Sequence, residues 1–176
     1  VLVAAAGRSS LTVALLGTWG SVQNLPTVAD RLTAHAIPAI PDVRAWTQIL
    51  SCSGSVVGAL IAALLAQAFN RRLTYALMCL LSLGACAYLF RGGLAYGSTY
   101  LFWVFVVGAV TAGFYGWLPL YLPELFPTAV RASGQGFGFN FGRIIAAVGV
   151  LQVRSLMAAF DNDYAKACSM AAAVYL

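Results

Sequence analysis

The stretch from Gly113 to Arg143, GFYGWLPLYLPELFPTAVRASGQGFGFNFGR, joins two apolar segments through a short charged connection. One acid and one base, Glu124 and Arg131, stand in the middle of it. Proline breaks helices because its ring clashes with the preceding turn and it has no N–H to donate. We therefore expect two apolar helices joined by an elbow at residues 122–131. Three prolines interrupt the stretch: Pro119, Pro123 and Pro127.

The composition of the whole chain indicates a membrane protein. Of its 176 residues, 61% are hydrophobic and 9% are charged, whereas a soluble domain carries about a quarter charged residues. The net charge of +5 comes from bases spread singly between apolar runs, which is typical of interfacial anchors and not of a nucleic-acid surface. We expect an integral, multi-pass protein in a lipid bilayer, without a nucleic-acid partner.

Long uncharged runs separate the charged residues, and a helix needs about 20 apolar residues to cross the hydrocarbon core of a bilayer. The runs lack the period-two alternation of membrane strands. The sequence therefore predicts an all-α membrane protein, a polytopic six-helix bundle. Because the chain begins without methionine and stops inside an apolar run, we expect a fragment whose last helix is truncated. The predicted helices lie near residues 10–29, 46–69, 73–91, 98–121, 132–154 and 164–176.

Small residues recur at every fourth position in three of these segments. Positions four apart share a helix face, and small side chains there let two backbones approach closely in lipid. We expect these faces to contact other helices instead of lipid. The stripes are Gly54, Gly58 and Ala62; Gly108, Ala112 and Gly116; and Gly134, Gly138, Gly142 and Ala146.

Two polar residues, Asn140 and Arg143, share a face of the predicted 132–154 helix. A charge at the centre of a bilayer costs at least about 2.5–3.5 kcal/mol on insertion scales, so such side chains face protein or water. One explanation of Arg143 is a substrate pathway, because guanidinium binds carboxylate or phosphate through two hydrogen bonds. The other is a structural ion pair with an acid elsewhere.

Enzyme motifs are missing from the sequence. It contains no HExxH, no serine–histidine arrangement and no pair of membrane-embedded aspartates, and its four cysteines form no CxxC pair. We expect no enzymatic activity, no metal site and no cofactor.

The elbow carries a family resemblance. LPELFPTAVRASGQGF, residues 122–137, resembles the loop between the tenth and eleventh helices of the major facilitator superfamily, closest to its sugar-porter and metabolite:proton symporter branches. The following GFNFGR, residues 138–143, also resembles that branch. AQAFNRR, residues 66–72, is similar to the loop between the eighth and ninth helices, with Gln67 in place of the usual aspartate and Asn70 in place of a glycine.

This resemblance implies the C-terminal half of a twelve-helix transporter, residues 1–176, whose partner would be the missing N-terminal half. It implies secondary active transport of a small organic solute, a sugar or an organic acid, by alternating access, with the site near the midplane. Protons are the expected coupling ion and a bacterial inner or plasma membrane the expected location. The chain has no membrane-embedded carboxylate, so a proton carrier would lie in the missing half.

The resemblance also assigns candidate residues. The candidate substrate contacts are Trp19, Gln23, Asn24, Tyr115, Trp117, Asn140 and Arg143. A candidate cytoplasmic gate consists of Arg71, Arg72, Glu124 and Arg131, and the candidate helix-packing residues are Gly134, Gly138 and Gly142. Two alternatives stay open: a homodimeric six-helix carrier and a membrane receptor that does not transport.

Overall fold

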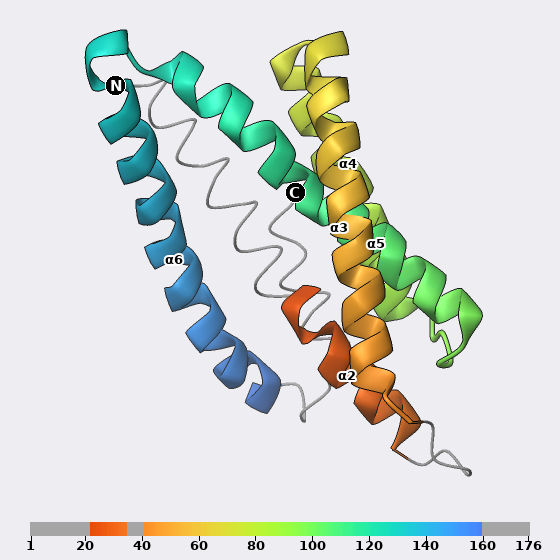
Figure 1. The fold of residues 1–176 in the computed structure, drawn as a ribbon. Helices are drawn as coiled ribbons and strands as arrows, with labels where there is room; N and C mark the ends of the chain where they lie inside the picture. Colours follow the sequence, from red (N-terminus) through yellow and green to blue (C-terminus); the bar gives the residue numbers. More distant parts are fainter. Residues whose placement is uncertain (1–21, 35–40, 160–176) are drawn as a thin grey trace.

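Helices make up the part of the chain that the computed structural model describes, residues 22–34 and 41–159, and this part contains no strand (Figure 1). The all-helical prediction is confirmed for these residues. The elements are the 3-10 turn η1 (Val22–Asn24), α2 (Leu25–Thr33), α3 (Val43–Ala68), α4 (Arg71–Arg91), α5 (Ser98–Tyr121), the 3-10 turns η2 (Leu122–Leu125) and η3 (Thr128–Val130), and α6 (Arg131–Ala159).

Three helices in the described part are long and apolar enough to cross a membrane: α3, α4 from Arg72 onward, and α5 with its continuation to Glu124. They correspond to the predicted helices at 46–69, 73–91 and 98–121. The sixth predicted helix and most of the first lie outside the described residues. The six-helix bundle therefore stays a prediction.

Helix ends differ from the predicted ones by a few residues because polar residues extend the helices beyond their apolar windows. α2 continues to Thr33, and α3 begins at Val43, after Asp42 in the left-handed conformation with φ 56°. Helical hydrogen bonds form equally well where a helix leaves the apolar layer, so a charged residue does not end a helix. α4 ends at Arg91 as predicted, and Gly93 follows in the left-handed conformation with φ 60°.

α5 continues through Pro119 to Tyr121, in agreement with the predicted helix at 98–121. Apolar helices tolerate an internal proline where neighbouring groups compensate for the lost hydrogen bond. The chain leaves the α-helix only beyond it, with Pro123 in the first turn of η2 and Pro127 at the N-cap of η3. The elbow thus consists of two short 3-10 turns.

α3 and α5 pack backbone against backbone, where two of the predicted glycine stripes meet. A Cβ atom added to any of four glycines would lie closer than 3.0 Å to a backbone atom of the opposite helix, a separation that real Cβ atoms essentially never show. In addition, the Ser55 hydroxyl lies 2.8 Å from the Ser51 carbonyl oxygen of its own helix and 3.3 Å from the Gly108 carbonyl oxygen of α5. The prediction that these stripes contact other helices is confirmed. The four glycines are Gly54 and Gly58 of α3 and Gly108 and Gly116 of α5.

α3 distributes its residues in the reverse of a soluble helix. Small or weakly polar residues occupy its buried face, whereas large apolar side chains are exposed. Water would favour the opposite arrangement, but lipid does not penalise exposed apolar groups, and small residues allow close packing there. The buried set includes Thr47, Ser51, Gly54, Gly58, Ala62 and Ala66, and the exposed set includes Trp46, Ile49, Val56, Leu60, Ile61 and Leu64.

α4 packs antiparallel on α5 through aromatic pairs. The ring centres of Tyr75 and Phe114 are 5.8 Å apart, and those of Tyr88 and Trp103 are 4.3 Å apart. α6 contacts this group through η2 and η3 and then runs back at an angle to α5 (Figure 1). α5 and α6 therefore diverge from each other, starting at the elbow.

Candidate functional site

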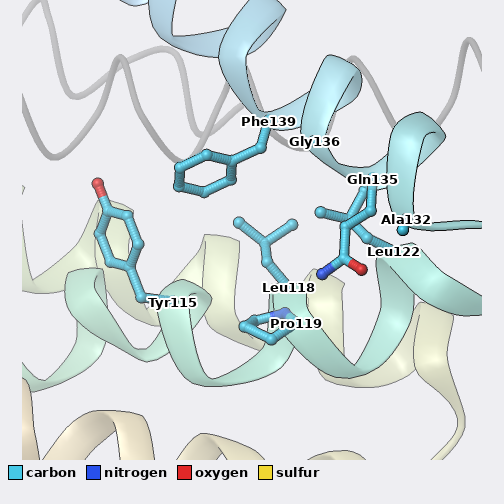
Figure 2. A pocket seen from close by; sticks show the side chains of 8 residues that line it. All are labelled: Tyr115, Leu118, Pro119, Leu122, Ala132, Gln135, Gly136 and Phe139. Carbon is cyan, nitrogen blue, oxygen red and sulfur yellow. The ribbon is translucent and has the colours of Figure 1, made fainter.

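A pocket of about 460 Å³ lies in the angle between α5 and α6 (Figure 2). On each helix the lining residues follow the spacing i, i+3 or i+4, and i+7, which places them on one face. The face of α5 and η2 consists of Tyr115, Leu118, Pro119 and Leu122, and the face of α6 consists of Ala132, Gln135, Gly136 and Phe139.

The pocket is mainly apolar and aromatic. Among the described residues, its lining side chains include no charged group, and their polar groups are the Gln135 amide and the Tyr115 hydroxyl. Figure 2 shows the Gln135 amide directed from α6 toward α5, and the Phe139 ring extending from α6 over Leu118. The Tyr115 hydroxyl lies at the far end of the view from the Gln135 amide. The two polar groups are therefore separated by an apolar middle.

Two glycines near the start of α6 differ in their surroundings. At Gly134, a Cβ atom would lie 2.5 Å from the nearest ring atom of Phe126, so this glycine lets the Phe126 ring close the elbow onto α6. At Gly136, which lines the pocket, a Cβ atom would meet no described atom within 4 Å. A larger side chain at this position can therefore enter the pocket without a clash at its Cβ. Further along the third stripe, Gly138 and Gly142 are buried.

Tyr115 and Trp117 do not face the same space. Residues two apart on an α-helix point about 200° apart. Tyr115 lines the pocket, whereas Trp117 is 1% exposed and packs among aromatic rings, with ring-centre distances of 5.5 Å to Tyr75 and 4.6 Å to Tyr121. Among the described residues, the indole N–H of Trp117 has no hydrogen-bond partner. Trp117 therefore belongs to the contact between α4 and α5.

Asn140 and Arg143 lie next to the pocket without lining it. The Asn140 side-chain amide donates to the Gly136 carbonyl oxygen at 2.9 Å. The Arg143 guanidinium lies 5.9 Å from the ring centre of Phe139, within the range of a cation–π interaction. Since Phe139 lines the pocket, Arg143 contacts one of its aromatic walls.

The other predicted residues whose side chains the structure describes do not line the pocket. Gln23 and Asn24 belong to η1, and Trp19 lies outside the described residues. The candidate gate residues Arg72, Glu124 and Arg131 are exposed, and the Arg71 side chain lies outside the described part. The turn from α3 to α4 and the elbow lie at the same end of the helices (Figure 1). The gate itself stays a prediction.

Of the eight described residues that line the pocket, the sequence had indicated only Tyr115 as a candidate contact, so sequence reasoning missed the other seven, together with one ion pair. Gln135 and Phe139 could have been found by counting three and seven positions along the helix face from Ala132. The ion pair joins Arg44 at the start of α3 to Asp30 of α2, with 2.6 Å between the guanidinium and the carboxylate. The hydrogen bond from Arg44 lowers the pKa of the Asp30 carboxyl. Asp30 and Arg44 are 14 positions apart in the sequence, across the long loop, so no local sequence pattern indicated the ion pair.

Two bacterial proteins are similar to the chain. An inner membrane metabolite transport protein of Escherichia coli (strain K12), YhjE, is 33% identical over 104 residues, and a putative metabolite transport protein of Bacillus subtilis (strain 168), YyaJ, is 29% identical over 113 residues. The chain resembles metabolite transport proteins. The matches cover 58% and 61% of the chain and support a major facilitator superfamily transporter, as the elbow motif predicted.

The extent of this similarity is partial. The chain spans about a quarter of the length of these relatives, 24% in each case. No protein-family model matches it, and no solved structure matches it. Together with the apolar helices α3, α4 and α5, the similarity shows an integral membrane protein.

Proposed function

We propose that the chain is part of a secondary active transporter that moves a metabolite across a membrane by alternating access. The observation that carries this proposal is the pocket between α5 and α6, which lies at the elbow stretch that resembles a loop of transporters. The names of the two relatives support transport of a metabolite. In this proposal the solute is a sugar or an organic acid and protons are the coupling ion.

The proposal places the chain in a larger assembly. The chain supplies the C-terminal six helices of a twelve-helix bacterial inner-membrane protein, and an N-terminal half completes the solute pathway. The pocket forms one wall of that pathway, with Tyr115 on α5 and Phe139 on α6. Arg72, Glu124 and Arg131, exposed at one end of the helices, form a cytoplasmic gate whose contacts change between states.

Filling the pocket tests this proposal. In the full-length protein reconstituted into vesicles, Gly136→Leu adds a side chain at a position where the Cβ has open space and the pocket lies beside it. The matched control is Gly84→Leu, because Gly84 on α4 also has no atom within 4 Å of an added Cβ and lies outside the pocket. Uptake of radiolabelled sugars and organic acids is measured for both variants.

We expect Gly136→Leu to abolish uptake at normal expression and Gly84→Leu to retain it. Equal uptake by the two variants would show that the pocket is not on the pathway. A wild-type protein that binds solutes without accumulating them would support the receptor alternative. A detergent-solubilised mass equal to two copies of a six-helix chain would support the homodimeric carrier.

Arg143→Gln separates the two explanations of this arginine. Loss of uptake of an acidic solute at normal expression supports a substrate role, because the neutral amide cannot replace the charge that binds a carboxylate. Loss of folded protein instead supports an ion pair with an acid elsewhere in the membrane.

A further inference from the structure

The size of the pocket limits what it can hold. Sites for small molecules usually measure about 300–1,000 Å³, and the pocket between α5 and α6, at about 460 Å³, lies within this range. It therefore has room for one ring-sized metabolite. Aromatic side chains favour stacked or edge-on contacts with flat rings, and the Tyr115 and Phe139 rings supply such surfaces from opposite helices (Figure 2).

The polarity of the pocket argues against a polyhydroxylated occupant. A buried hydroxyl that finds no hydrogen-bond partner weakens binding. A sugar would bring hydroxyls to every edge, whereas Leu118, Pro119 and Leu122 offer no side-chain donor or acceptor in the middle of the pocket. No charged side chain among the described residues lines the pocket, so these residues offer no counter-charge to a charged group there.

Gln135 defines the polar end of the occupant. A side-chain amide presents an N–H donor and a C=O acceptor next to each other. A lactam edge of a flat ring presents the same two groups in the complementary order and can form two parallel hydrogen bonds with the amide. Figure 2 shows the Gln135 amide reaching from α6 toward Leu118 and Pro119, the apolar surface on which such a ring would lie.

We propose that the pocket selects a flat, uncharged ring with an amide-like edge, as in a pyrimidine lactam, over a sugar. This inference rests on the proposed transport of a metabolite and replaces the sugar or organic acid named above with a different class of solute. The ring lies between Tyr115 and Phe139, and its donor–acceptor edge faces Gln135. The Arg143 guanidinium, 5.9 Å from the centre of the Phe139 ring, helps to hold the Phe139 side chain in place.

Two measurements on the full-length protein separate this inference from the transport function. The first is stabilisation of the detergent-solubilised protein by uracil or glucose, since a ligand that binds the folded state raises its unfolding temperature. The second is uptake of radiolabelled uracil, glucose and organic acids into vesicles. We expect uracil to stabilise the protein, glucose to have no effect, and Gln135→Leu to weaken uracil binding by about tenfold, as two neutral hydrogen bonds would.

Matched variants complete the test. Gln48→Leu removes an exposed glutamine of α3 outside the pocket and should leave uracil binding unchanged, whereas Gly136→Leu should abolish it. Stabilisation by glucose but not by uracil, or uracil binding that Gln135→Leu does not weaken, overturns the inference. If the inference is overturned in this way but glucose or an organic acid is taken up into the vesicles, the proposed transport function stands without the inference. If the variants change uracil binding as expected but no solute is taken up, the result supports the pocket chemistry and contradicts the transport function.

Discussion

Gly58→Ala tests the backbone contact between α3 and α5. The new methyl group would lie closer than 3.0 Å to three backbone atoms of Ala109, and none of them can rotate away as a side chain would. The two helices must therefore separate. Overpacking of this kind costs about 1–3 kcal/mol.

Gly84→Ala provides the reference for this substitution. Gly84 also lies inside a helix, but an added Cβ meets no atom within 4 Å. Replacing glycine by alanine inside a helix stabilises it by about 0.5–1 kcal/mol in either place. The difference between the two variants removes this contribution and leaves the steric cost, so Gly58→Ala should be less stable than Gly84→Ala by about 1–3 kcal/mol.

Reversible unfolding of the full-length protein in mixed detergent micelles measures this difference. The free energy of unfolding of each variant is compared with that of the wild type under identical conditions. A difference below about 0.5 kcal/mol would refute the reasoning, because single surface changes alter stability by that much without any clash.

Two further predictions concern other contacts. Trp117→Phe should keep most of the stability, because a phenyl ring retains the contacts with Tyr75 and Tyr121 and leaves no indole N–H buried without a described partner. Trp117→Ala should cost about 3–5 kcal/mol in the same unfolding assay. Equal losses of stability in the two variants would contradict this prediction. Because the hydrogen bond from Arg44 lowers the pKa of Asp30, the ion pair stabilises the fold above the ordinary aspartate pKa of about 3.9 and loses its effect as the pH falls through the lowered value. The stability difference between wild type and Asp30→Asn should thus be present at neutral pH and vanish under strong acid, and a difference that grows on acidification would contradict the ion pair.

Much of the helical framework could be predicted from the sequence. Long uncharged runs indicated α3, α4 and α5, because crossing a bilayer requires a minimum apolar length. The glycine stripes around Gly58 and Gly108 indicated a close contact, because only small residues allow it. Both signals are local in the sequence and depend on a single physical requirement.

The site was harder to predict because it depends on the direction of side chains and on the angle between helices. Pro119 lies inside the helix predicted at 98–121, but the sequence did not indicate that this proline lines a pocket. Tyr115 and Trp117 were grouped as cavity residues, although helix geometry alone would have separated them. Gln135 shares a helix face with Ala132, but only the meeting of α5 and α6 identifies that face as a wall of the pocket.

The backbone contact between α3 and α5 also determines how this protein can evolve. Every amino acid other than glycine has a Cβ, so no missense change at Gly54 or Gly58 is conservative, and even the smallest alternative forces the helices apart. Val56 and Leu60 are exposed on the same helix and should tolerate replacement by other apolar residues. Tolerance to mutation should therefore rise and fall with the helical repeat along α3, with the strictest positions occupied by the residues that have no side chain.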